Sequence, residues 1–317
     1  TAWPRSLTAR RLLFNIQLPA LLHTQRYDLV VGFDIDGFLC SGTGGDTPYL
    51  VAIKGVIAEE MQHECGRTRL LFEVLSRLER HNARGADAVL TTSNYCRDAI
   101  ERRYGVPARR VLLVPEGIDL PRWRRIAAQP RASDGATILC VARQYPRKHI
   151  ADLLRALPIV LQDVPHTRTV IIGDGPQHAA LRRLAAELSL DAAVQFRGSL
   201  PDDEQVARCY RQADIFCLPS VQEGFGIVFL EAMASGLPIV AARAAAVPEV
   251  VPQGRAGLLV PPSDVTALAE ALIELLKNPD QRAAYGAFGQ EYVVRYDWDR
   301  VAGVFLDQVA PFLARAQ

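Results

Sequence analysis

The sequence has no apolar run that approaches the ~20 residues needed to cross a bilayer, and no cleavable signal pattern opens it. Nothing in its composition indicates disorder, because 49% of its 317 residues are hydrophobic and its formal net charge is only +1. A chain of this length and balance is enough for two globular domains with cores of their own. We therefore expect a soluble protein of the cytoplasm, with no nucleic acid as partner.

Motifs that bind metal are also missing. The six cysteines form no Cys-x-x-Cys pair and no cluster with histidine at zinc spacing, so we interpret them as reduced thiols, several of them buried. The pair in Asp34-Ile-Asp36 has the form of a metal-binding motif, but two aspartates after a strand are common in turns. We assign this pair to a turn, and expect no metal and no other cofactor.

Lysine is scarce, with three residues at positions 54, 148 and 277, so that Lys148 is not part of a general basic coat. The charge is also unevenly spread. Residues 1–132 hold 19 Lys plus Arg against 14 Asp plus Glu, and the remainder holds 17 against 21. A basic front half suits a phosphorylated acceptor or an anionic surface.

What the sequence does contain is a regular alternation of strand and helix patterns. In the second half we expect strands near 137–142, 168–173, 193–197, 214–218, 238–241 and 257–260, with helices between them. This alternation predicts a parallel sheet with helices on both faces, and hence the α/β class. We place the domain boundaries at residues 1–120, a linker over 121–135, residues 136–297, and a last helix over 298–317.

The front half predicts strands at 27–33, 48–53, 86–93 and 111–114 and a helix over 94–104. A long charge-rich helix is expected over 54–84, and a first helix over 1–23. The first helix is expected to pack on a sheet, although basic amphipathic helices also lie on anionic lipid, and both placements stay open. The apolar stripes are Leu70, Leu71, Val74, Leu75 and Leu78 in the long helix, and Leu12, Leu13, Ile16 and Leu22 in the first.

The most informative stretch covers residues 220–236, where we expect a strand end, a loop and a helix over 227–234. Gly224 and Gly226 let the backbone approach a ligand, and free amides at a helix start attract phosphate. Glu223 and Glu231 bracket this helix start. Because carboxylates repel phosphate but accept hydrogen bonds from hydroxyls, the combination indicates a phosphate joined to sugars. The alternative is that both glutamates are solvated charges that suit the helix dipole.

Two sets of motifs resemble one known family. The two glutamates with seven residues between them around Gly-Phe-Gly, followed by Ala-Ser-Gly-Leu-Pro-Ile-Val, resemble the signature of the retaining GT-B glycosyltransferases of family four. The Tyr-Gly-Val-Pro and Val-Pro-Glu-Gly-Ile-Asp series before residue 120 is similar to the end of the first domain in that family. The resemblance implies two Rossmann-like domains that face a central cleft, with Glu223 at the donor sugar and Glu231 at the nucleotide ribose.

Arg143 lies just past an expected strand and Lys148 five residues later, where open α/β sheets bind their ligands. In the family this pair binds the donor diphosphate, and it neutralises charge on the leaving group, as a divalent metal does elsewhere. The alternative is that both make surface ion pairs. The catalytic residues implied are Glu223, Arg143 and Lys148, and the donor-binding residues are Gly173, Arg197, Gly224, Phe225, Gly226, Ile227 and Glu231.

The sequence departs from the family pattern at several points. His149 stands where many relatives carry Gly, and residues 244–246 are alanines in a loop that usually contains glycines. No strand and Gly-Gly loop of the kind that opens the family precede Thr1, so we expect a front domain that lacks its first strand or strands. Lys54 follows a strand where relatives often have His, which makes it a candidate contact to the acceptor or the sugar.

The function expected from the sequence is metal-independent transfer of a sugar from a nucleotide-sugar, with UDP, GDP or ADP as the nucleotide. The acceptor is a hydroxyl of a sugar, lipid-linked or phosphorylated molecule, which suits peripheral contact with the inner face of a membrane. The resemblance implies attack from the face that the nucleotide leaves, and the front half offers no obvious nucleophile for the alternative, a double displacement. Two alternatives stay open: a nucleotide-sugar epimerase, and a truncated chain that binds nucleotide without transfer.

Overall fold

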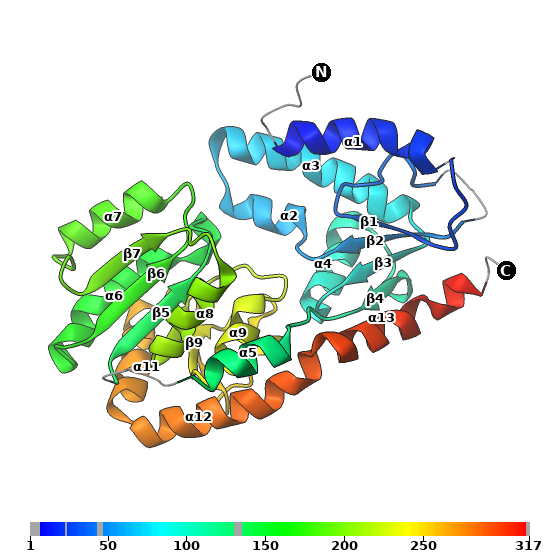
Figure 1. Cartoon of the computed structure of the whole chain (residues 1–317). Helices are drawn as coiled ribbons and strands as arrows, with labels where there is room; N and C mark the ends of the chain where they lie inside the picture. The colour runs from blue at the N-terminus through cyan, green and yellow to red at the C-terminus, as the bar shows by residue number, and fades with distance from the viewer. Residues whose placement is uncertain (1–6, 23, 43–46, 130–134, 315–317) are drawn as a thin grey trace. The chain divides into compact units, whose positions relative to one another are not determined.

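A computed structural model of the chain describes residues 7–22, 24–42, 47–129 and 135–314 (Figure 1). The chain divides into two compact units, Thr1–Pro115 with Val301–Gln317, and Glu116–Arg300. Each unit has its own parallel sheet and its own apolar core. The prediction of two Rossmann-like α/β domains is therefore confirmed.

The first unit is built on a four-stranded parallel sheet of order β1-β2-β3-β4. Its strands are β1 (Val30–Phe33), β2 (Tyr49–Ile53), β3 (Ala88–Thr91) and β4 (Val111–Leu113). The two central strands are buried at every residue, as expected for a parallel sheet that is covered on both faces. All four strands run in the same direction, so their carboxyl ends meet at one edge of the sheet.

Helices cover both faces of this sheet. On one face, residues of α4 pack with Val51 and Val89. On the other, Phe305 and Phe312 of α13 pack with Leu50 and Leu90. The helical segments of the unit are α1 (Leu7–Leu22), α2 (Ile57–Glu60), η1 (Met61–His63), α3 (Gly66–Gly85), α4 (Asn94–Tyr104), η2 (Ala108–Arg110) and α13 (Trp298–Leu313), of which α13 begins three residues before Val301.

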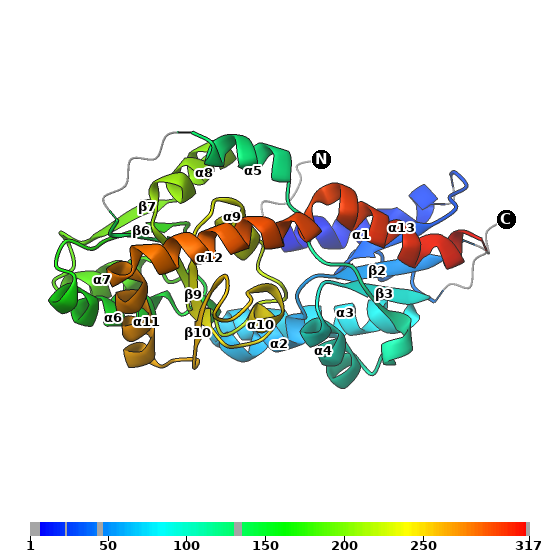
Figure 2. The ribbon, with the colours of Figure 1, turned by 90° about the horizontal axis from the view of Figure 1, so that it is seen from below.

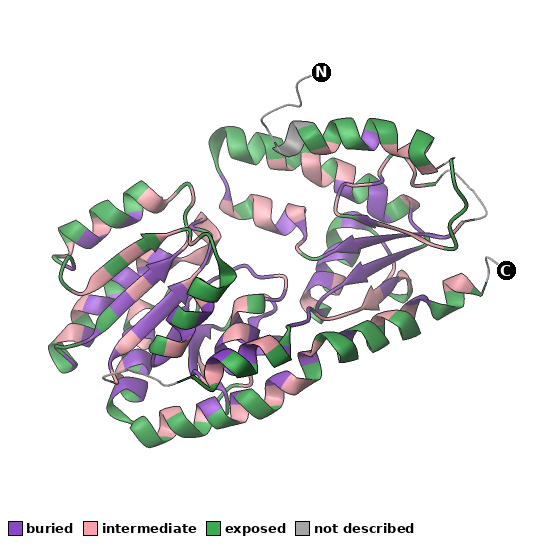
Figure 3. Cartoon of the chain, viewed as in Figure 1, coloured by how far each residue is buried: buried purple, intermediate pink, exposed green. Residues whose placement is uncertain are grey.

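The single helix expected over 54–84 is wrong, because the chain forms α2, η1 and α3 in its place. Cys65 is extended and Gly66 has φ +54°, which ends the first helical stretch and starts α3. The expected apolar stripe is also wrong for Leu70, Leu71 and Val74, whereas Leu75 and Leu78 are half-buried. Leu70 is 64% exposed and Val74 53%, whereas the buried face of α3 carries Glu79 and Asn82 (Figure 3).

In helix α1, too, predicted apolar residues are exposed and a polar residue is buried. The expected apolar stripe of Leu12, Leu13 and Ile16 is exposed, while Asn15 is completely buried. Asn15 donates a hydrogen bond to the Asp36 carboxylate and accepts one from the backbone N–H of Gly37. Polar contacts therefore fix this helix to the unit, and the expectation of apolar packing on the sheet is wrong for these three residues.

The second unit contains a six-stranded parallel sheet of order β10-β9-β8-β5-β6-β7. Its strands are β5 (Thr137–Val141), β6 (Arg168–Ile172), β7 (Val194–Gly198), β8 (Ile215–Leu218), β9 (Ile239–Ala242) and β10 (Gly257–Val260), each close to its expected position. The strand order reverses between β5 and β8, which are neighbours in the sheet. Ligands of open α/β sheets bind at the carboxyl ends of strands around such a switch point.

Helices lie on both faces of the second sheet. Contacts join α6 (Ile150–Asp163), α7 (His178–Glu187) and α11 (Val265–Lys277) into one group, and α5 (Leu120–Ala127), α8 (Asp203–Gln212) and α9 (Ile227–Ala234) into the other. Helix α12 (Pro279–Tyr292) runs beside α9 (Figure 2). The remaining short elements are η3 (Pro146–Lys148), α10 (Val247–Val250) and η4 (Val293–Tyr296).

Most of α5 falls in the segment that the sequence assigns to a linker. This helix buries Leu120, Trp123 and Ile126 in the core of the second unit. Asp119 caps its N-terminus by accepting a hydrogen bond from the backbone N–H of Arg122. Residues 130–134 of the expected linker lie outside the described residues.

Candidate functional site

The loop between β8 and α9 holds Glu223 beside the start of the helix. Helix α9 begins at Ile227, as expected, and its N-cap is Gly226 with φ +94°. A Cβ at Gly226 would lie 2.6 Å from the Phe229 ring, so both the backbone angle and the close contact require glycine. Within the described part of the chain no side chain caps this helix start, and the first amides of such a start attract anions.

Lys148 and Glu223 form a buried ion pair at the centre of this site. Lys148 Nζ lies 2.5 Å from Glu223 Oε1, and the two side chains are 14% and 9% exposed. Little water reaches such a pair, so each charge depends on the other for compensation. The structure thus brings together two of the three residues to which the sequence assigns catalysis.

The loop after β5 is fastened to the loop after β8 by backbone contacts. The carbonyl oxygen of Arg147 accepts hydrogen bonds from the Ser220 hydroxyl at 3.1 Å and from the backbone N–H of Val221 at 3.0 Å. His149 follows with φ +50°, a left-handed conformation that explains why glycine is usual at this position. The His149 ring lies 2.7 Å from Asp152 Oδ2, so its side chain is anchored on the first turn of α6.

Glu231 lies about one turn into α9, away from the ion pair. Its carboxylate accepts a hydrogen bond of 2.7 Å from the hydroxyl of Tyr210, whose ring is fully buried. Burial raises the pKa of Glu231, and the bond from Tyr210 opposes that shift. Tyr210 is itself held by a stacked contact with Phe216 and an edge contact with Trp123. Glu231 is therefore an oriented acceptor that suits a hydroxyl donor.

Arg143 and Gly173 line one pocket, together with Asp174, Gly175 and Ser199. Gly173 has φ +113°, and a Cβ there would lie 2.0 Å from the carbonyl oxygen of Ala142. Glycine at this position lets the loops after β5 and β6 approach each other. The pocket combines an exposed guanidinium with a glycine turn, which is an arrangement that can receive a phosphate.

Gln144 connects these two loops and was not singled out by the sequence. Its buried side chain donates to the carbonyl oxygen of Gly173 at 2.7 Å, and its Oε1 lies 2.9 Å from the ring of His178. The backbone N–H of Gln144 also donates to the carbonyl oxygen of Asp174 at 3.0 Å. A glutamine beside a strand end has no sequence signature of its own; its position directly after Arg143 was the available signal.

Arg197 does not join the other predicted residues. Its guanidinium contacts Gln195 Oε1 at 3.0 Å and Cys209 Sγ at 3.2 Å. It lines a different pocket, which Thr137, Arg168 and Gln212 also line. The assignment of Arg197 to the donor therefore stays a prediction without support from its position.

The remaining predicted residues divide between core and surface. Phe225 is buried against Tyr296, with ring centroids 5.5 Å apart, whereas Ile227 is 40% exposed at the start of α9. Gly224, directly before Phe225, is partly buried. Lys54 belongs to the first unit, where it follows β2, and its carbonyl oxygen accepts a hydrogen bond from the Thr92 hydroxyl.

The loop over 244–246 has alanines where glycine was expected, and Ala245 adopts φ +49°. The backbone N–H of Ala246 donates to the carbonyl oxygen of Glu223 at 3.2 Å. This alanine loop therefore keeps a left-handed conformation that favours glycine and supports the backbone of a predicted catalytic residue.

Within the described residues, no group of three or more His, Cys, Asp and Glu side chains is arranged to hold a metal ion. In the same part of the chain, none of the helices has both the length and the apolar character needed to span a bilayer.

Two family models match the chain. Residues 121–292, more than half of the chain, match the model described as glycosyl transferases group 1. Residues 1–122 match the model described as glycosyltransferase family 4.

Individual relatives agree with these matches. The chain is 33% identical over 273 residues to the GDP-mannose-dependent alpha-(1-6)-phosphatidylinositol monomannoside mannosyltransferase of Mycobacterium tuberculosis, covering 81% of this chain and 70% of that protein. It is 32% identical over 239 residues to the D-inositol 3-phosphate glycosyltransferase of Saccharomonospora viridis, covering 70% and 55%. The solved structure of sucrose-phosphate synthase from Thermosynechococcus elongatus superposes with a TM-score of 0.80 at 26% identity, covering 100% and 82%.

Proposed function

The chain belongs to the glycosyl transferases group 1 family, and we propose that it moves a mannosyl group from GDP-mannose to a hydroxyl of an inositol-containing acceptor. The donor is suggested by the relative from Mycobacterium tuberculosis, whose name specifies GDP-mannose. The acceptor is suggested by the inositol that the names of both relatives contain. If the acceptor is linked to a lipid, transfer takes place at a membrane surface.

The buried pair of Lys148 and Glu223 is the observation that carries this proposal. A lysine held in a site that excludes water stabilises negative charge on a departing diphosphate more strongly than an exposed one. Arg143 lies exposed near the start of the same loop after β5, where it can pair with a second phosphate oxygen. When phosphate takes up the charge of Lys148, Glu223 becomes free to accept hydrogen bonds from the donor sugar.

We assign retention of configuration to attack from the face that the nucleotide leaves. The acceptor oxygen forms a bond to the anomeric carbon while the bond from that carbon to the phosphate oxygen breaks. The proton of the acceptor hydroxyl passes to the leaving phosphate oxygen, so the products are the glycoside and GDP. In this scheme Glu223 orients the sugar and forms no covalent intermediate, and Lys148 and Arg143 supply the positive charge that a metal supplies elsewhere.

Calorimetric titration with GDP, UDP and ADP, with and without a chelator, tests the donor site first. Tight binding of GDP that the chelator leaves unchanged supports the proposal. Tight binding of UDP or ADP alone refutes the choice of GDP-mannose. Failure of all three to bind would mean that this chain has no formed donor site.

Transfer is tested with GDP-mannose and a phosphatidylinositol mannoside in vesicles. An α-linked product, identified by NMR of the anomeric proton, supports retention. A β-linked product, or a mannosyl group trapped covalently on Glu223, would refute the front-face mechanism. GDP-mannose consumed without a glycoside would indicate a chain that lacks acceptor transfer.

A further inference from the structure

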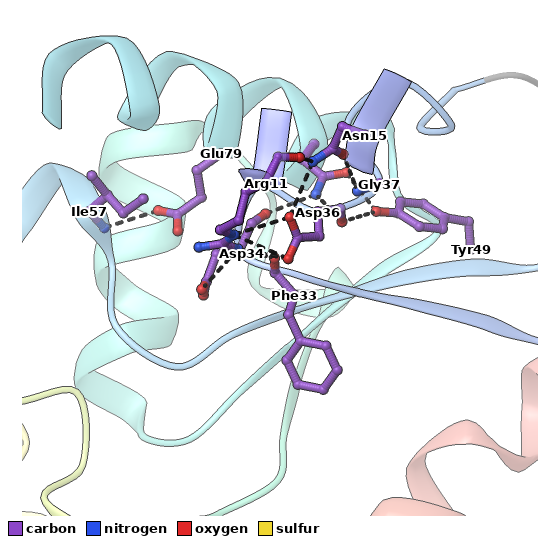
Figure 4. Close-up of polar contacts among 10 residues, drawn as sticks. Arg11, Asn15, Phe33, Asp34, Asp36, Gly37, Tyr49, Ile57 and Glu79 are labelled. Atoms are coloured by element: carbon purple, nitrogen blue, oxygen red, sulfur yellow. Dashed lines mark hydrogen bonds and ion pairs between the residues drawn. The ribbon is translucent and has the colours of Figure 1, made fainter. Parts of the chain in front are cut away.

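A polar cluster lies at the carboxyl end of β1, where Asp34 and Asp36 follow the strand (Figure 4). The Asp36 carboxylate accepts hydrogen bonds from Arg11 Nε at 3.1 and 3.2 Å, from Arg11 Nη2 at 3.0 Å and from Asn15 Nδ2 at 3.1 Å. These bonds occupy both of its oxygens and fix α1 to the sheet. The hydrogen bonds of Asp36 therefore account for it as a structural residue.

Asp34 is held differently. Among the residues that the structure describes, its carboxylate has one contact, of 3.5 Å to Arg11 Nη2, which is already bonded to Asp36 and to the carbonyl oxygen of Phe33. Its side chain is 34% exposed, so part of it remains accessible. A carboxylate can accept about four hydrogen bonds, and most of that capacity is not used by the contacts of Asp34.

The backbone of Asp34 is also unusual. It has φ +52°, which a non-glycine residue adopts only at some cost, although aspartate tolerates this region better than most. Its N–H donates to the carbonyl oxygen of Ala52 on β2 at 2.9 Å. This bond keeps the end of β1 beside the end of β2, from which Lys54 follows.

The charges around Asp34 define the chemistry of the cluster. Burial raises the pKa of Asp34, while Arg11 and Lys54 act against that shift. Lys54 follows β2, the neighbour of β1, at the same edge of the sheet. A carboxylate repels phosphate and accepts hydrogen bonds from hydroxyls, whereas an ammonium donates to hydroxyl oxygens. Together they suit a ring with several adjacent hydroxyls.

We propose that Asp34, with Lys54 at the same edge of the sheet, binds adjacent hydroxyls of the acceptor, which is a polyhydroxylated ring of the sugar or cyclitol class. The inference rests on the proposed function, since it names the residues of the first unit that recognise the acceptor. Asp34 lies at the carboxyl edge of the sheet and has a left-handed backbone. Its carboxylate also has capacity for further hydrogen bonds. Asp36, two positions away, has none of that spare capacity and provides a matched control.

Saturation-transfer NMR with myo-inositol and with methyl α-mannoside, in the presence of GDP, tests the proposal on the full chain. We compare the unchanged chain with Asp34→Asn, which keeps the size of the side chain but loses its charge. Loss of one charge-assisted hydrogen bond should weaken polyol binding roughly tenfold. Calorimetric titration of GDP should give the same affinity for both proteins.

Asp36→Asn serves as the control, and it should lower the melting temperature while leaving polyol affinity within about twofold of the unchanged chain. Equal polyol affinity of the unchanged chain and Asp34→Asn, or no polyol binding by the unchanged chain, overturns the assignment. Either result with intact GDP binding leaves the proposed function standing. Loss of GDP binding in the unchanged chain is a separate result that refutes the proposed function itself.

Discussion

The two units bury their polar groups in different places. In the second unit, Lys148 and Glu223 lie in loops that follow the strands β5 and β8. In the first unit, Glu79 and Asn82 lie in the second half of a long helix and are completely buried. The comparison teaches that charged residues after strand ends can be recognised from the sequence. Polar residues on the buried face of a helix are harder to predict, because leucines elsewhere on the same helix produce an apolar pattern that points to the wrong face.

The largest effect should come from breaking the ion pair of the second unit. Lys148→Met removes the buried cation and should lower turnover roughly a hundredfold or more, because a preorganised stabiliser of the leaving charge is lost. Initial rates with saturating GDP-mannose measure this effect. Lys277→Met is the matched control, since Lys277 pairs with Asp163 on the surface and both side chains are about half exposed. Equal losses in the two variants would contradict the role of Lys148.

A second comparison separates the two glutamates that flank the start of α9. Glu231→Gln removes a charged acceptor, so GDP affinity should fall roughly tenfold, while the amide oxygen can still accept from Tyr210. Glu223→Gln should lower turnover and leave GDP affinity nearly unchanged, because Glu223 is assigned to the sugar. Calorimetry with GDP and initial rates distinguish the two, and identical behaviour would contradict the assignment of roles.

Much of the second unit could be predicted from its sequence, because a short apolar run marks each strand. Helix α9 has the predicted bounds, and each of the six strands lies within two residues of its expected position. The sequence could not reveal Gln144, since its contacts come from residues some thirty positions away. Arg197 lines a different pocket from Arg143, because side-chain direction on the edge strand β7 decides which pocket an arginine lines, and its assignment to the donor stays a prediction.

The first unit was predicted less well, and α3 shows why. Helical periodicity selects leucines as the buried face, but Asn82 binds the Tyr49 hydroxyl and the carbonyl oxygens of Asp34 and Asp36. These long-range partners offset the cost of burying the amide. The same holds for Asn15 in α1. Sequence periodicity contains no information on such partners, so the polar cluster of Figure 4 became visible only in the folded chain.

The burial of Glu79 in helix α3 can be tested by the pH dependence of the stability of the chain. It accepts hydrogen bonds from the Tyr104 hydroxyl and from the backbone N–H of Ile57, yet burial raises the pKa of Glu79 to about 8. Between its ordinary pKa near 4.5 and this value, the folded chain keeps a proton that the unfolded chain has released. Its contribution to stability is thus full below the lower pKa and is lost as the pH rises through the upper one.

The expected loss is about 1.4 kcal/mol between pH 6 and pH 7. Glu79→Gln keeps the neutral shape of the side chain and should remove this dependence, which denaturant unfolding at a series of pH values measures. Glu73→Gln, an exposed position on the same helix, should leave the dependence unchanged. A pH profile that Glu79→Gln leaves unaltered would show that this glutamate is ionised in the folded chain.

The smallest expected effect concerns the alanine loop behind Glu223. Ala245→Gly places glycine at φ +49°, where the Cβ of alanine is strained, and should stabilise the chain by about 1 kcal/mol. In a unit of this size, that corresponds to a rise in melting temperature of about 2–4 °C. Ala186→Gly, an exposed position inside α7, should have the opposite sign and about the same size, because glycine weakens a helix. The sign of the change in melting temperature therefore shows whether Ala245 is strained. Destabilisation by both substitutions would show that the left-handed backbone at Ala245 carries no strain, and that alanine suits this loop as well as glycine does.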